Sequence, residues 1–180
     1  GARRELVRLL PLYGNAGALH HEALHAKKVI DEARQSIAEA LGAHEDEIIF
    51  TGSGTEANNL AIQGVLEPLR ALESEGLYTT ELGVDSEGLV SLSDLAGAIT
   101  DQTVFVSIQL VNSEVGTIQP VHDIAREIRR IKKLRGGIEG SLPLYFHTDA
   151  SQAPLWLPLR VDQLGVDFLT LDAQKILGPK

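Results

Sequence analysis

Apolar residues recur early in the chain at steps of three and four positions, which is the spacing of one face of an α-helix. Between residues 20 and 41 this stripe consists of Ala23, Ala26, Ile30, Ala33, Ile37 and Leu41. Gly42 follows directly, and a glycine just beyond the last periodic residue is a common helix stop. The pattern therefore predicts an amphipathic helix over residues 20–41.

Short apolar runs alternate with further helical patterns over the rest of the chain. Four runs predict strands: 47–51, 103–108, 144–148 and 166–171. The run at 103–108 is apolar and β-branched, as expected for a strand covered on both faces. Helical patterns begin near residues 55, 65, 91 and 124. This alternation predicts an α/β domain with a mostly parallel sheet flanked by helices.

Two of these helices carry additional signals. Ser91–Asp94 fits a capping box, which predicts a helix from there through Ile99. The helix after it is predicted by the stripe Ile124, Ile128, Ile131 and Leu134, with Gly136 and Gly137 closing it. Basic residues between positions 126 and 133 surround this stripe. They are most simply a solvated helix face, and the docking of a partner is the alternative.

The composition is that of an ordinary globular domain, with 43% hydrophobic and 23% charged residues in a chain of 180. The formal net charge of −9 argues against a general binder of nucleic acid or membrane surfaces. No apolar stretch has the length of a membrane span, and the start lacks a signal-peptide pattern. Because cysteine is absent as well, we expect a reducing, cytoplasmic compartment.

Three segments that could carry chemistry each follow a predicted strand, where open α/β sheets bind ligands. Ser53–Glu56 leads into a helix, whose free N–H groups suit a phosphate. Asp149 precedes Ser151 and Gln152, and Lys175 precedes a Gly-Pro turn. Taken singly, each has an ordinary structural explanation as a turn or a solvated side chain.

Five stretches give these segments a common interpretation. They are Gly14–His20, Ile48–Ile62, Val111–Pro120, His147–Gln152 and Gln174–Lys180. In this order they resemble the cysteine desulfurases, pyridoxal-phosphate (PLP) enzymes of the class V aminotransferase-like group. The resemblance covers nearly the whole chain. It implies that residues 1–180 form the large, PLP-binding domain of a type I PLP-dependent transferase fold, without the small C-terminal domain.

The resemblance implies roles at the cofactor ring. Lys175 would be the catalytic residue that forms the internal aldimine, which needs a neutral amine. Asp149 would pair with the ring nitrogen and keep it protonated, so that the ring can accept electrons. Gln152 would hydrogen-bond the phenolic oxygen of the ring, and Asn112 would help hold the substrate carboxylate.

The resemblance also implies a phosphate site and one departure from the family pattern. Gly54 and Thr55 would bind the phosphate through backbone N–H and hydroxyl groups. Where the family commonly has Ser-x-His-Lys, this chain has Asp-Ala-Gln-Lys at 172–175. Gln174 can still donate a hydrogen bond to the phosphate or to a backbone group. Asp172, if it faced the phosphate, would repel it.

The implied reaction takes sulfur from L-cysteine, leaving alanine and a persulfide on a mobile cysteine, for iron-sulfur cluster or thio-cofactor supply. This chain has no cysteine and starts with Gly, so we expect a fragment, with the thiol beyond Lys180. The chain alone would then be inactive. The implied partners are L-cysteine, a second copy in a homodimer, and a sulfur-acceptor or scaffold protein. His20 would be a structural or dimer-interface residue.

The resemblance breaks between Gly64 and Val65. Residues 60–64 match the end of one family helix, and residues 65–70 match the helix after the next strand. We therefore expect a missing segment, which would hold that strand and the histidine that stacks on the cofactor ring. The alternative is one continuous helix from Glu56 to Glu75, which Gly64 and Pro68 would weaken.

Three other interpretations compete with a PLP enzyme. His21–His25 is a literal H-E-x-x-H zinc motif, but no third-ligand motif follows it, and we expect no metal. A catalytically degenerate or split relative that serves as an interaction module is the stronger rival. A nucleotide-binding domain is the third, although the glycines do not form G-x-G-x-x-G and Asp149 and Lys175 would be unexplained.

Overall fold

A parallel sheet of three strands forms the centre of the computed structural model, which describes residues 2–70, 78–176 and 178. The strands are β1 (Phe105–Gln109), β2 (Tyr145–Asp149) and β3 (Phe168–Thr170), in the order β1-β2-β3. Both outer strands pair with β2 in parallel. The predicted strands at 103–108, 144–148 and 166–171 are therefore confirmed, with shifted ends, and so is the α/β fold class.

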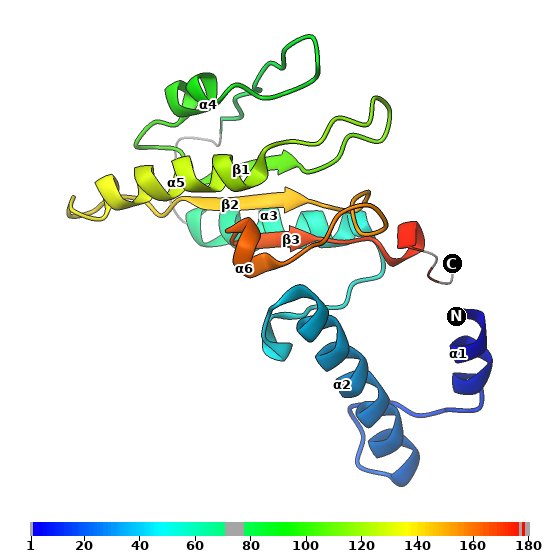
Figure 1. Ribbon diagram of the computed structural model, residues 1–180. Coiled ribbons are helices and arrows are strands. Elements are labelled where there is room, and N and C mark those ends of the chain that lie inside the picture. Colours follow the sequence, from blue (N-terminus) through cyan, green and yellow to red (C-terminus); the bar gives the residue numbers. More distant parts are fainter. Residues whose placement is uncertain (1, 71–77, 177, 179–180) are drawn as a thin grey trace.

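Helices flank this sheet. They are α1 (Ala2–Leu9), α2 (His21–Leu41), α3 (Gly54–Arg70), α4 (Leu92–Ala98), α5 (Val121–Arg135) and α6 (Val161–Leu164), with short 3-10 helices η1 (Glu45–Glu47) and η2 (Ala173–Ile176). In Figure 1, α5 and α3 lie on opposite sides of β2, whereas α1 and α2 extend away from the sheet. Within the described ranges, no helix combines the length and the apolar character needed to cross a membrane.

The hydrophobic core lies between the sheet and α5. Neighbouring strand residues point to opposite faces of a sheet, and Val106, Ile108 and Phe146 all point to the face that α5 covers. The predicted stripe of α5 supplies Ile124 and Ile128, which are both fully buried. Two basic residues of α5, Arg126 and Arg130, form exposed ion pairs along the helix with Asp123 and Glu127, which agrees with a solvated face.

The predicted helix ends are present in the structure. Gly42 ends α2 in the left-handed region, with a φ of 66°, which a side chain would disfavour. The Ser91 hydroxyl caps α4 by accepting a hydrogen bond from the Asp94 amide at 3.3 Å. Gly136 closes α5. Local sequence signals therefore placed these three boundaries correctly.

The prediction that β1 is covered on both faces is wrong. Val106 and Ile108 are buried, but the alternate residues Ser107 and Gln109 are exposed. β1 is an outer strand of the sheet, and the main contacts of α3 with the sheet are on β2 and β3. One face of β1 is consequently left open.

The prediction of a buried strand over residues 47–51 is also wrong. This segment follows η1 and is irregular, with Ile49 69% and Phe50 49% exposed. A strand needs a neighbour for its backbone hydrogen bonds, and no described residue pairs with this segment in a sheet. Arg34 of α2 contacts this segment instead. Its Nε atom donates to the Ile48 carbonyl at 3.3 Å, and its guanidinium lies over the Phe50 ring.

The helix α3 runs without interruption through Gly64 and Pro68 as far as Arg70. The continuous-helix alternative is therefore the one that the structure contains over residues 54–70. The rest of the predicted helical pattern, up to Glu75, falls outside the described residues. The predicted missing segment between Gly64 and Val65 stays a prediction.

Ile128 and Leu134 provide a test of the core, because both belong to the predicted stripe but only Ile128 is buried. We expect Ile128→Ala to lower the free energy of unfolding by about 2–5 kcal/mol, since it leaves a cavity under the sheet. Leu134 is 64% exposed, so Leu134→Ala should change it by no more than about 0.5 kcal/mol. Urea unfolding followed by circular dichroism measures both. Equal losses in the two variants would contradict this packing.

Candidate functional site

The carboxyl ends of the strands and the start of α3 lie at the same edge of the sheet (Figure 1). The loop that follows β1 begins there, because the Leu110 amide donates to the Asp149 carbonyl at 2.8 Å. The loop after β3 meets α3, since a Cβ atom built on Gly54 would lie 3.5 Å from the Asp172 Cβ atom. The predicted segments around residues 54, 112, 149 and 175 thus belong to one edge.

Asp149, the last residue of β2, is held by donors on both carboxylate oxygens. Its Oδ2 atom accepts from Asn58 Nδ2 at 2.8 Å, and its Oδ1 atom accepts from the Ser151 amide at 2.9 Å. Burial by itself raises the pKa of Asp149, but the hydrogen bonds from Asn58 and Ser151 and the nearby His147 outweigh burial and lower it below its usual range. Asp149 is therefore ionised at neutral pH.

His147 lies two residues before Asp149 on the same face of β2 and is almost completely buried. Its two ring nitrogens lie 2.9 Å from Ser107 Oγ and 3.0 Å from Thr170 Oγ1. Its ring stacks on Phe105. Burial lowers the pKa of His147, and the charge of Asp149 offsets this only in part. The imidazole is therefore neutral at neutral pH and ties the three strands together beneath the site.

The start of α3 is shaped by a cap and by a glycine. The Ser53 hydroxyl accepts from the Glu56 amide at 3.1 Å, and the Glu56 carboxylate accepts from the Gly52 amide at 2.6 Å. A Cβ atom on Gly54 would lie 3.7 Å from Ser151 Oγ and 3.6 Å from Asp172 Oδ2. A longer side chain would fill the space between α3 and the loops after β2 and β3. Thr55 follows with an exposed side chain.

The segment with Lys175 forms the short helix η2 directly after β3. Asp172 holds it, because its Oδ1 atom accepts from the Gln174 amide at 2.9 Å and its carbonyl accepts from the Lys175 amide at 3.1 Å. The side chains of Gln174 and Lys175 are both exposed. The Asp172 carboxylate lies beside Gly54 at the start of α3, with its Oδ2 atom 3.6 Å from the Cβ position of Gly54.

Two predicted residues lie at the same edge but make different contacts. Asn112 shapes the turn after β1, because its Oδ1 atom accepts from the amides of Glu114 and Val115 at 2.9 and 3.1 Å. Gln152 is partly buried three residues beyond Asp149. Asn112 therefore lies at the site and also shapes the loop after β1.

The sequence interpretation assigned no role to Asn58 or His147, although both contact the machinery around Asp149. The positions of both residues relative to predicted site residues could have indicated these contacts. Asn58 lies four residues after Gly54, hence on the same face of the helix. His147 lies two residues before Asp149, hence on the same face of the strand. Only the packing of α3 on β2 shows that the two faces meet.

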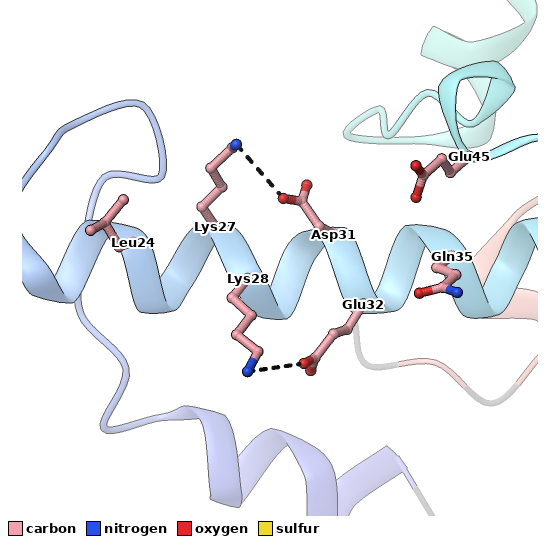
Figure 2. Close-up of a pocket in the computed structure, with 7 residues that line it drawn as sticks. All are labelled: Leu24, Lys27, Lys28, Asp31, Glu32, Gln35 and Glu45. Carbon is pink, nitrogen blue, oxygen red and sulfur yellow. Dashed lines mark ion pairs between the residues drawn. The ribbon is translucent and has the colours of Figure 1, made fainter.

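The surface hollow in Figure 2 lies away from this edge, on α2 and η1. It is lined by Leu24, Lys27, Lys28, Asp31, Glu32, Gln35 and Glu45. Its charges pair along the helix, Lys27 with Asp31 at 3.9 Å and Lys28 with Glu32 at 3.8 Å. Such exposed pairs contribute about 0.3–0.5 kcal/mol each. The hollow contains none of the predicted site residues.

His21 and His25 lie on the exposed surface of the first turns of α2. Among the residues that the structure describes, no three His, Cys, Asp or Glu side chains are grouped so that they could hold a metal ion. The expectation that this H-E-x-x-H motif binds no zinc stays a prediction.

Curated proteins similar to this chain are named cysteine desulfurases. The chain is 39% identical over 189 residues to cysteine desulfurase IscS of Dictyoglomus turgidum, covering 93% of this chain and 45% of the relative. It is 37% identical over 203 residues to the mitochondrial cysteine desulfurase of Candida albicans, covering 98% of this chain and 39% of the relative. The chain thus spans less than half the length of these relatives.

Solved structures agree with this result. One described as SspA in complex with cysteine has a TM-score of 0.84 and 33% identity, covering 100% of this chain and 55% of its own. A NifS-like protein has a TM-score of 0.86 and 29% identity, covering 98% and 52%. The sequence model of aminotransferase class-V matches residues 8–74 and 67–180. With this match over nearly its whole length, the chain belongs to the aminotransferase class-V family.

Proposed function

We propose that this chain is the cofactor-binding part of a PLP-dependent cysteine desulfurase, which takes sulfur from L-cysteine and leaves alanine and an enzyme persulfide. The observation that carries the proposal is the ionised Asp149 at the end of β2, held by Asn58 and Ser151. It lies at the same edge as the start of α3 and the segment with Lys175. The named relatives support the same activity.

The residues present fit the ring of PLP. When bound, this cofactor supplies an electron-withdrawing ring that stabilises negative charge on the substrate carbon. An ionised carboxylate with two fixed donors suits a protonated ring nitrogen, which is the role we assign to Asp149. Lys175 would attach the cofactor covalently and move protons at its Nζ atom. Gln152 would donate to the phenolic oxygen.

The phosphate end fits less well. The backbone N–H groups at Gly54 and Thr55 open α3, and a helix N-terminus favours an anion. Gln174 would add a donor. The Asp172 carboxylate, 3.6 Å from the Cβ position of Gly54, brings a like charge to the same place. We infer that Asp172 weakens phosphate binding in this protein relative to a neutral side chain.

The substrate and the partners follow from the same proposal. Asn112 would hold the carboxylate of L-cysteine through its amide. The relative called SspA is described in complex with cysteine, which supports this substrate class. Because this chain contains no cysteine, a thiol elsewhere in the complete protein would take the sulfur. We propose a cytoplasmic homodimer that passes it to an acceptor or scaffold protein, for iron-sulfur cluster or thio-cofactor supply.

The domain organisation is part of the proposal. Residues 1–180 would be the large domain, with the small C-terminal domain outside this chain. The class-V match consists of two overlapping pieces, residues 8–74 and 67–180, so it divides close to the predicted break after Gly64. The rival function, a degenerate or split relative that acts as an interaction module, is favoured by Asp172 alone.

We expect Lys175 to carry the cofactor. The complete protein, incubated with PLP and reduced with borohydride, should contain the adduct on the peptide with Lys175, because Lys175 lies in the segment after β3, at the same edge of the sheet as Asp149. Mass spectrometry locates the adduct. Lys175→Ala should abolish both the adduct and turnover of L-cysteine. Lys27→Ala, which changes an exposed lysine on α2, is the matched control and should keep both. Labelling at another lysine only would refute this assignment.

Asp172 gives a second, independent expectation. Asp172→Ser in the complete protein should bind PLP about tenfold more tightly, because a like charge near the phosphate is removed, and tenfold corresponds to ~1.4 kcal/mol. Pyridoxal, which lacks the phosphate, should bind both proteins equally. Equilibrium titration followed by absorbance measures the two affinities. If PLP and pyridoxal respond alike to the substitution, Asp172 does not act on the phosphate.

A further inference from the structure

Asn58 connects α3 to Asp149 across 91 residues of sequence. Its Nδ2 atom lies 2.8 Å from Asp149 Oδ2. An ionised carboxylate can only accept hydrogen bonds, so the amide nitrogen of Asn58 has to face Asp149 and the amide oxygen has to face away. The chemistry of Asp149 therefore sets the orientation of the Asn58 side chain.

The amide oxygen that faces away from Asp149 has no hydrogen-bond donor beside it among the described residues. Asn58 Oδ1 is buried and, among the residues that the structure describes, it accepts no hydrogen bond. A buried polar atom without a partner destabilises a fold by about 1–3 kcal/mol. Leucine has a similar shape and carries no polar atoms. The hydrogen bond from Asn58 Nδ2 to the ionised Asp149 contributes about 1.5–3 kcal/mol and offsets this cost. An asparagine at this position is therefore explained by its contact with Asp149.

Asn58 is the residue of α3 whose side chain donates to Asp149, and the other neighbours of Asp149 surround this contact. In the adjacent strands the paired residues are Gln109 and Thr170, which are both uncharged. His147 is the titratable group on the same strand, and burial keeps its pKa low. The Asp172 carboxylate lies beside Gly54, one helical turn before Asn58, and accepts from the Gln174 amide. Ser151 holds the second carboxylate oxygen through its backbone amide.

We propose that Asn58 is a positioning residue, which holds Asp149 ionised and oriented for the ring nitrogen of the cofactor. By donating to Oδ2, it makes Asp149 a weaker base and thereby keeps the shared proton on the ring nitrogen. The purpose assigned to Asn58 rests on the proposed function. Its effect on Asp149 does not, because it can be measured in the protein without cofactor.

The first test is the titration of Asp149 by NMR in the complete protein without cofactor, with 13C-labelled aspartate carboxyl groups and Asp149→Asn to assign the signal. In Asn58→Leu we expect the pKa of Asp149 to rise by about one unit, because one donor is lost. In Asn58→Asp we expect a larger rise, because a second carboxylate is added. Asn59→Leu, one residue along and exposed, is the matched control and should leave the titration unchanged.

Thermal unfolding and the titration together separate positioning from packing. If Asn58 positions Asp149, Asn58→Leu should change the unfolding temperature at pH 7 only slightly while it shifts the titration, because the lost hydrogen bond and the removed buried oxygen offset each other. If Asn58 only fills space, Asn58→Leu should leave the titration of Asp149 unchanged, because the two side chains have similar shapes. The proposal is overturned if Asp149 titrates identically in the wild type and in Asn58→Leu. If the leucine variant does not fold, an unchanged titration of Asp149 in Asn58→Asp overturns it instead.

The second test uses the complete protein with PLP labelled with 15N in the ring. The 15N chemical shift reports whether the ring nitrogen carries a proton. We expect the protonated value in wild type and Asn59→Leu, and a shift toward the unprotonated value in Asn58→Leu. An identical shift in all three proteins refutes the purpose assigned to Asn58. If instead no PLP binds to the wild type, the proposed function fails, and the titration still decides whether Asn58 controls Asp149.

Discussion

Parallel pairing along β2 is the constraint on which the arrangement of this protein depends. Since β1 and β3 both run parallel to β2, the residues that follow all three strands lie at one edge of the sheet. Every connection must then return over a face of the sheet, and α5 does so over one side. The same constraint brings Asp149, Asn112 and Lys175, which are far apart in sequence, to a common edge.

The electrostatics of this edge result from the same packing. Asp149 sits where burial alone would favour its neutral form, yet donors from α3 and from its own loop keep it charged. His147 below it is neutral because its hydroxyl partners and the surrounding strands exclude water. A second carboxylate, Asp172, lies beside the start of α3. The partial positive charge of that helix end faces a negative group of the protein itself.

The strand predicted at 47–51 and the two-sided burial predicted for 103–108 are wrong for one reason, which is that both depend on the neighbouring elements. Residues 47–51 have the β-branched and aromatic composition of a strand, but no described strand lies beside them, and Arg34 packs there instead. Residues 103–108 are apolar, but α3 packs on β2 and β3 and leaves one face of β1 open. Composition indicates what a segment could form or bury, and its neighbours in the fold decide whether it pairs and how many of its faces are covered.

The sequence by itself determined the features that arise within a few residues. These include the amphipathic stripe of α2, its end at Gly42, the Ser91 cap of α4 and the buried stripe of α5, because helical periods and caps are local hydrogen-bond chemistry. The order of the family-like stretches also placed Asp149 at the end of β2 and Lys175 after β3. Only the tertiary structure decided that Asn58 meets Asp149, that His147 is enclosed by Ser107 and Thr170, and that Asp172 faces Gly54. Contacts between residues distant in sequence depend on how helices pack on strands, and no local pattern encodes that packing.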